Sequence, residues 1–193
     1  MAGEAAPMID LFETARQLQD FCDGQGWRSC VIGGIAVQRW SEPRLTRDVD
    51  LTLLAGFGGE GDFIDRLLAA YQGRIENAGA FARRHRVVLL RTTGGVGIDV
   101  SLGGLPFEES MVSRATVFSF GPGLDIRTCS AEDLIVLKLF ASRPLDIRDA
   151  EGVVIRHGDQ LDWRYVEEQL RPLAEVKQEP EILSTLARLR RST

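Results

Sequence analysis

The sequence predicts an α+β fold in which a mixed sheet flanked by helices is followed by a C-terminal helical segment. Two observations predict it: β-prone runs alternate with helical patterns over the first two-thirds of the 193 residues, and only helical patterns follow Ser130. We therefore expect a core over residues 1–129 and a helical subdomain over residues 130–193. Hydrophobic residues make up 44% of the chain and charged residues 26%, which is typical of a globular protein.

Six β-prone runs and three helical patterns account for the first two-thirds of the chain. The first helix is indicated by Ile9, Phe12, Leu18 and Phe21, which recur at helical spacing until Gly24 closes the segment. In order, the sequence predicts a helix over 9–23, a strand over 29–32, a helix over 35–40, a strand over 48–54, a helix over 63–71, and strands over 86–90, 96–102, 115–120 and 124–127. Glycine-rich segments between them are typical of turns.

The last third of the chain reads as four helices. Ser130 and Asp133 make a start similar to a capping box for a helix that runs to about residue 143, where Pro144 breaks it. Helical patterns resume over 146–155, 163–170 and 180–191.

Several kinds of protein are disfavoured by composition. No run approaches the roughly 18 uninterrupted apolar residues of a membrane span. The start, MAGEAAPMIDLFE, lacks the charged and apolar regions of a secretory signal, so we expect a cytoplasmic protein that does not interact with a membrane. Cys22, Cys30 and Cys129 stand at unrelated spacings beside only two histidines, which predicts reduced, mostly buried thiols and no zinc site.

The chain carries 23 basic and 28 acidic residues, which gives a net charge of −5 at pH 7. This balance argues against bulk, non-specific binding of nucleic acid, because phosphate contacts depend on a surplus of basic side chains.

Gly33 and Gly34 stand where a short strand meets a helix. Two glycines there allow a phosphate to approach the backbone, and the following helix start offers free N–H groups and the positive end of a dipole. Taken alone, a Gly-Gly pair is also an ordinary turn.

Three aspartates on the predicted strands carry the second chemical signal. The alternation of a strand puts Asp48 and Asp50 on one face, about 7 Å apart, where they repel each other. A hard divalent cation such as Mg²⁺ relieves that repulsion. If the strand of Asp99 is a neighbour, its carboxylate joins them, and three carboxylates suit the two metal ions used in phosphoryl or nucleotidyl transfer. The alternative for Asp48 and Asp50 alone is a solvated edge strand.

Together these residues resemble the signature of the nucleotidyltransferase superfamily, which has the DNA polymerase β-like fold. The signature is carried by Val31-Ile-Gly-Gly34, a 13-residue gap, Asp48-Val-Asp-Leu51 and a later Ile98-Asp-Val100. With Arg44-Leu-Thr-Arg47, it is similar to the branch that holds AbiEii-type toxins and MenT-like proteins, and aminoglycoside nucleotidyltransferases are similar over the same stretch. The later Asp133–Asp149 stretch, with its helical lysine followed by Arg and Asp, is also similar to that branch.

The resemblance implies a role for each residue of the signature. Asp48 and Asp50 would hold two Mg²⁺ ions, with Mn²⁺ as a substitute, and Asp99 would ligate the ion that activates the attacking hydroxyl and accept its proton. Gly33 and Gly34 would cradle the β- and γ-phosphates of an NTP, for example ATP. Many members have serine after the first glycine, whereas Gly34 supplies only backbone.

Lys138 is the one polar residue in the apolar run 134–140, and at helical spacing it shares a face with Leu134, Ile135 and Ala141. Two interpretations are open. Its apolar stem is buried while the ammonium reaches solvent, or the ammonium is a counter-charge for a triphosphate. The resemblance favours nucleotide binding.

Other polar residues near the signature have less distinct roles. Thr46, just before the strand, is expected within reach of a nucleotide. Asp146 and Asp149 are explained by helix-dipole pairing or capping after Pro144. The basic run 83–86 is explained by a solvated turn rather than a nucleic-acid contact.

The resemblance implies an Mg²⁺-dependent nucleotidyltransferase that moves an NMP group from an NTP to a hydroxyl of RNA, protein or a small molecule. A toxin role, with a cognate antitoxin as partner, is one biological setting for it. The alternative is a catalytically silent nucleotide-binding or regulatory module that keeps the fold. The clustered carboxylates of Asp48, Asp50 and Asp99 argue against that alternative, because without a metal their repulsion destabilises the fold.

Overall fold

The computed structural model describes residues 5–191, with side chains from residue 10 onward. These residues form two compact units. The first unit extends to Ile35 and includes Leu45–Cys129, and the second combines Ala36–Arg44 with the residues from Ser130 onward. The dividing line falls inside helix α2 (Gly33–Trp40), which the sequence did not indicate.

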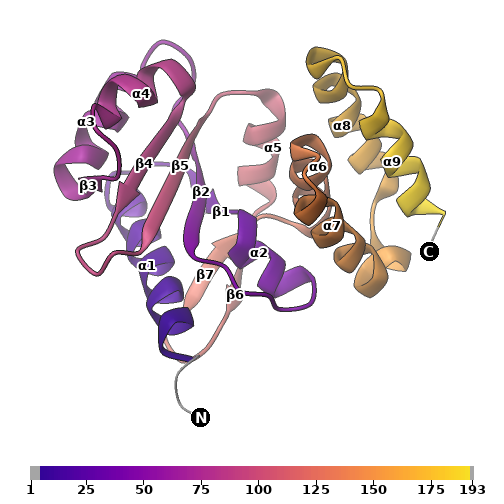
Figure 1. Cartoon of the computed structure of the whole chain (residues 1–193), viewed down its shortest axis with the longest axis horizontal. Coiled ribbons are helices and arrows are strands. Elements are labelled where there is room, and N and C mark those ends of the chain that lie inside the picture. The colour runs from indigo at the N-terminus through magenta and orange to yellow at the C-terminus, as the bar shows by residue number, and fades with distance from the viewer. Residues whose placement is uncertain (1–4, 192–193) are drawn as a thin grey trace. The chain divides into compact units, whose positions relative to one another are not determined.

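A seven-stranded mixed sheet forms the centre of the first unit, and it confirms the predicted α+β class. The spatial order is β3-β4-β5-β2-β1-β7-β6 (Figure 1). The strands are β1 (Ser29–Val31), β2 (Asp48–Leu54), β3 (Gln72–Gly73), β4 (Val87–Arg91), β5 (Gly97–Gly103), β6 (Thr116–Ser119) and β7 (Asp125–Thr128). The β2–β5 and β1–β7 pairs are parallel, and the other four pairs are antiparallel.

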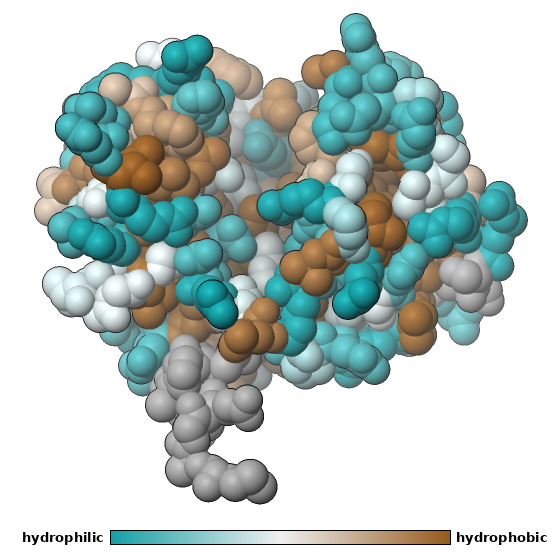
Figure 2. All heavy atoms as spheres, in the orientation of Figure 1, coloured by the Kyte–Doolittle hydropathy of each residue, from teal (hydrophilic) through white to brown (hydrophobic). Residues whose placement is uncertain are grey.

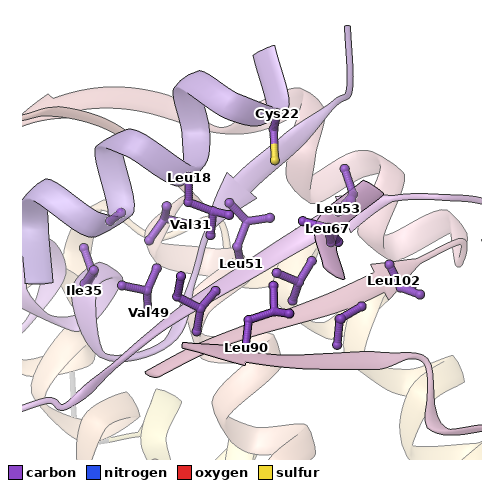
Figure 3. Packing of buried hydrophobic residues seen from close by; sticks show 14 of the residues in the cluster. Leu18, Cys22, Val31, Ile35, Val49, Leu51, Leu53, Leu67, Leu90 and Leu102 are labelled. Atoms are coloured by element: carbon purple, nitrogen blue, oxygen red, sulfur yellow. The ribbon is translucent and has the colours of Figure 1, made fainter. Parts of the chain in front are cut away.

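One face of this sheet carries the hydrophobic core of the first unit. Helices α1 (Ala5–Gly24), α3 (Glu60–Ala70) and α4 (Ala78–His85) supply side chains to it. Figure 3 shows Leu18 and Cys22 of α1 above Val31 and Leu51 of the central strands. Alternate strand residues point into this core because side chains of a strand alternate between the two faces.

The opposite face of the sheet carries polar side chains together with helix α5 (Pro106–Arg114), which contacts β2. A Cβ added at Gly103 would lie 3.1 Å from Thr52 of β2 and 3.2 Å from Glu108 of α5, so the helix crosses close over this face. Helix α5 was not predicted, although its start bears recognisable signals. Pro106 opens it, and the Glu108 carboxylate accepts hydrogen bonds from the backbone N–H groups of Gly104 and Leu105.

Helix α4 corrects one sequence interpretation. Arg83, Arg84 and His85 form its last turn and are not a solvated loop. Basic residues at this end suit the negative end of the helix dipole, and Arg83 also pairs with Asp65 at 2.7 Å. The pattern was missed because alanines and one phenylalanine are the only apolar residues of this eight-residue helix.

The second unit is helical, as predicted for the C-terminal segment. Helix α6 (Ala131–Ala141) begins at Ser130, whose hydroxyl accepts a hydrogen bond from the N–H of Asp133. It packs against α7 (Pro144–His157), α8 (Trp163–Lys177) and α9 (Glu181–Arg190), and a short 3-10 turn, η1 (Gly158–Gln160), follows α7.

Two boundaries in the second unit differ from prediction. Pro144 opens α7 instead of only ending the preceding helix, because proline is tolerated in the first turn. Helix α8 continues to Lys177 with Pro172 inside it, seven residues beyond the predicted end.

Hydrophilic and hydrophobic residues are interspersed on the face drawn in Figure 2, with the hydrophobic residues in separate patches. The three cysteines are free thiols and buried, as predicted. None of the helices in the described part of the chain is both long and apolar enough to cross a membrane.

Candidate active site

Three aspartates meet on the polar face of the sheet. In the parallel β2–β5 pair, Asp50 lies opposite Asp99, and Asp48 lies opposite Gly97. Val49 and Ile98 point to the core face, so the three carboxylates share the other face. Adjacent strands are about 4.8 Å apart, which brings Asp50 and Asp99 from distant parts of the chain next to each other.

The glycine turn lies directly beside this acidic face. Helix α2 begins at Gly33, whose φ of +60° is in the left-handed region that favours glycine. A Cβ at Gly33 would overlap the carboxylate of Asp50, and a Cβ at Gly34 would overlap the hydroxyl of Thr46. Gly33, Gly34, Thr46 and Asp50 are therefore neighbours, and any larger residue at the two glycine positions would displace the polar groups.

Arg74 joins the cluster, and sequence reasoning missed it. It follows the short strand β3, and its guanidinium lies 2.6 Å from Asp99 and 3.4 Å from Asp48. Gly97 makes room for this contact, because a Cβ there would overlap Asp48 and lie 2.7 Å from Nη1 of Arg74. No motif surrounds Arg74 in the sequence, so only the folding of β3 beside β4 brings it here.

Electrostatics of the cluster shift the pKa of Asp99. Burial is the largest cause and raises the pKa of Asp99 above its ordinary value. The positive charge of Arg74 opposes this rise, whereas the neighbouring carboxylate of Asp48 adds to it. Ionisation of Asp99 therefore lowers the free energy of unfolding.

The donor set of the cluster has the chemistry of a magnesium site, since Mg²⁺ prefers carboxylate oxygens. As the side chains lie, however, no three His, Cys, Asp or Glu residues between residues 5 and 191 are grouped so as to hold a metal ion. Asp48 and Asp99 instead contact the guanidinium of Arg74. Asp48, Asp50 and Asp99 are the residues that could hold a cation after a side-chain rearrangement.

Lys138 belongs to the second unit, where it is buried in a network of charged side chains. Its Nζ lies 2.8 Å from both Asp146 and Asp149, and its side chain is only 8% exposed. Arg44 donates two hydrogen bonds to Asp149, at 2.6 and 2.7 Å, and Arg143 pairs with Asp146 at 2.5 Å. The ammonium does not reach solvent, so the snorkelling interpretation is wrong. Nucleotide binding by Lys138 stays a prediction.

The same network corrects the interpretation of Asp146 and Asp149. Asp146 does lie in the first turn of α7, but both carboxylates are buried and ion-paired rather than serving as simple caps. Burial by itself raises the pKa of Asp149, but the hydrogen bonds and charges of Arg44 and Lys138 outweigh it and lower the pKa below its ordinary value.

A mixed sheet in which a glycine turn lies beside paired aspartates is the arrangement that the resemblance to nucleotidyltransferases implies. The chain belongs to the family described as "Nucleotidyltransferase of unknown function (DUF6036)", whose model matches residues 6–182. This match confirms the resemblance to the nucleotidyltransferase superfamily. None of the curated proteins compared with the chain matches it significantly.

Among the solved structures that match, two illustrate the shared fold over nearly the whole chain. One is an antigenic nucleotidyltransferase-like protein from Paracoccidioides brasiliensis, 18% identical with a TM-score of 0.55, and the match covers 92% of each chain. The other is the antibiotic-resistance factor ANT(2'')-Ia, 16% identical with a TM-score of 0.53 over 94% of this chain and 97% of that one. At these identities the likeness shows the fold.

Proposed function

We propose that this protein transfers an NMP group from an NTP to a hydroxyl acceptor, at the face formed by Asp48, Asp50 and Asp99. One observation carries the proposal: Asp50 and Asp99 are in register on parallel strands beside the Gly33–Gly34 turn. Membership of a nucleotidyltransferase family supports the same reaction class.

Each residue has a distinct task in the proposed reaction. The free N–H groups at the start of α2 bind the β- and γ-phosphates, and Gly33 and Gly34 let them approach the backbone. Asp99 accepts the proton of the acceptor hydroxyl. The acceptor oxygen then bonds to the α-phosphorus, the bond to the bridging oxygen breaks, and pyrophosphate leaves.

Divalent cations complete the proposal. Two Mg²⁺ ions, or Mn²⁺, held by Asp48, Asp50 and Asp99 would supply charge neutralisation for the phosphates and for the attacking oxygen. The donor chemistry of the three carboxylates supports this assignment. Thr46 lies at Gly34 and would contact the bound nucleotide through its hydroxyl.

The acceptor is an RNA, a protein or a small molecule, and charge favours one of these. A chain with a net charge of −5 attracts a cationic small molecule and repels a polyanion such as RNA. A fold relative is an antibiotic-resistance factor, which is consistent with a small-molecule acceptor. A toxin role with an antitoxin partner would place the same chemistry on RNA or protein.

The test is transfer of label. The protein is incubated with each α-labelled NTP, Mg²⁺, and either cell extract or a panel of aminoglycosides, and the labelled product is identified. Asp50→Asn should abolish labelling, whereas Asp65→Asn, which removes the same charge from an exposed residue of α3, should not.

The labelling assay, combined with a measurement of NTP binding by the same proteins, distinguishes an enzyme from the catalytically silent module. NTP binding without any labelled product, in wild type and Asp50→Asn alike, would show a nucleotide-binding module rather than an enzyme. Binding that is unaffected by chelation of Mg²⁺ would also contradict the proposal.

A further inference from the structure

Arg74 reaches the acidic face from the edge of the sheet. Its backbone N–H donates to the carbonyl of Leu89 in β4, which fixes the residue just after β3. From there the guanidinium crosses to β5 and β2, where it contacts Asp99 and Asp48. Its side chain is 30% exposed, so it is neither buried in the core nor free in solvent.

The guanidinium contacts the carboxylate oxygens on which the proposed function depends. Nη2 lies 2.6 Å from Oδ1 of Asp99, which is the distance of a strong charge-assisted hydrogen bond. Nη1 lies 3.4 Å from Oδ1 of Asp48 and fits into the space left by the missing side chain of Gly97. A cation bound by both oxygens would compete with the guanidinium for the same lone pairs.

We propose that Arg74 is a positioning residue that competes with divalent cations for Asp48 and Asp99. The inference rests on the proposed function and deepens it, because it makes cation binding an exchange. The cation enters as the guanidinium leaves, and the two carboxylates always keep a positive partner. In the absence of the cation, Arg74 holds Asp48 and Asp99 on one face against their mutual repulsion.

The test is a titration of the purified full chain with Mn²⁺ in the absence of nucleotide, with free Mn²⁺ followed by its EPR signal. Arg74→Gln should bind Mn²⁺ about tenfold more tightly than wild type, since losing one charge-assisted competitor is worth roughly that factor. Arg74→Lys should lie between the two, because an ammonium keeps the charge but cannot bridge two carboxylates. Arg83→Gln is the matched control, since it removes the same charge from the exposed pair with Asp65 and should leave Mn²⁺ affinity unchanged.

Thermal unfolding provides a second readout that does not depend on activity. In EDTA, Arg74→Gln should melt below wild type, because the carboxylates then repel each other without a partner. Added Mg²⁺ should raise the melting temperature of Arg74→Gln more than that of wild type. If Mg²⁺ restores nothing, Arg74 is a structural residue and the proposal is wrong.

The remaining outcomes are distinguishable. Equal Mn²⁺ affinity in wild type and Arg74→Gln, or weaker affinity in the variant, would overturn the role of Arg74 while leaving the cation site intact. Absence of Mn²⁺ binding in wild type and in both Arg74 variants, at millimolar concentration, would overturn the metal-dependent function itself and the inference with it. If Arg74→Gln does not fold, the Mn²⁺ affinity of Arg74→Lys is compared with that of wild type instead, and a smaller increase is expected.

Discussion

Two clusters of aspartate and basic side chains, one in each unit, differ in charge balance and burial. On the polar face of the sheet, Asp48 and Asp99 both contact the guanidinium of Arg74, and their side chains are 49% and 30% exposed. In the helical unit, Asp146 and Asp149 are almost fully buried and face three basic side chains, from Arg44, Lys138 and Arg143.

The two clusters also differ in the pKa values of their carboxyl groups. The pKa of Asp99 is raised, whereas the pKa of Asp149 is lowered. A surplus of negative charge at the first cluster is a cost that a bound cation can relieve. The second cluster is satisfied by its own side chains. A cluster with a surplus of negative charge is thus the better candidate for a cation site, and a cluster whose carboxylates are all ion-paired is the better candidate for a structural role.

The largest expected effect is on catalysis at the cluster on the sheet. Asp50→Ala should lower the rate of NMP transfer by roughly a thousandfold or more, because a reaction that relies on carboxylate-held cations loses a ligand. In metal-free buffer, however, its free energy of unfolding should equal or slightly exceed that of wild type, since one of three repelling charges is gone. Transfer assays and urea unfolding in EDTA measure both. Asp48→Ala should behave alike, and marked unfolding of both variants would identify the aspartates as structural.

The cluster in the helical unit should respond in the opposite way. Lys138→Met should lower the free energy of unfolding by about 3 kcal/mol, because it leaves two buried carboxylates short of a partner. Lys177→Met is the comparison, since this other lysine of the chain is 28% exposed and pairs with the exposed Glu179, so its loss should cost less than that of Lys138.

Nucleotide titration of the same variants tests the predicted role of Lys138. If Lys138→Met is as stable as wild type yet binds an NTP roughly 10- to 150-fold more weakly, its ammonium contacts the triphosphate. Unchanged affinity with lost stability would assign Lys138 to the internal network alone.

As the pH falls, the contributions of Asp149 and Asp99 to the free energy of unfolding should change in opposite directions. A lowered folded-state pKa makes ionised Asp149 stabilising above its unfolded pKa of about 3.9, and this contribution is lost as the pH falls below that value. A raised folded-state pKa makes ionised Asp99 destabilising, so its protonation recovers stability as the pH falls through its folded pKa. Urea unfolding at a series of pH values should therefore show Asp99→Asn and Asp149→Asn deviating from wild type in opposite directions. Parallel curves would contradict the contrast between the clusters.

The smallest effect is expected at a solvent-exposed ion pair. Arg83 and Asp65 lie 2.7 Å apart with side chains 52% and 67% exposed. Asp65→Asn should change the free energy of unfolding by less than about 0.5 kcal/mol, because solvent and salt screen such pairs. A larger loss would mean that ion-pair distance, rather than burial, governs these energies.

Local patterns allowed much of the fold to be predicted from the sequence. The alternation of Asp48–Leu54 and the β-prone runs over 115–120 and 124–127 are visible within a few residues, and the structure has strands at all three places. Helix α4 escaped because its charged last turn conceals a short apolar face. The assignment of residues 36–44 to the second unit depends on packing between distant segments, which no local pattern records.

The residues of the candidate site also divide into those that the local sequence predicts and those that depend on the whole fold. The spacing of Asp48 and Asp50 places them on one face by geometry alone. The position of Asp99 beside them depends on parallel pairing of β2 with β5, which only the family resemblance suggested. Arg74 and the partners of Lys138 could not be predicted, because each contact joins segments whose proximity is decided by the whole fold.

The parallel β2–β5 pair has a consequence for how the protein folds. Asp50 and Asp99 meet only after the long crossover that contains α3, β3, α4 and β4 has brought the two strands together. Non-local pairing of this kind is slow. Here it must also bring the negatively charged side chains of Asp50 and Asp99 together at the centre of the sheet. Because dissolved salt screens such repulsion, folding should accelerate as ionic strength rises, and cations that bind the carboxylates should accelerate it at much lower concentration.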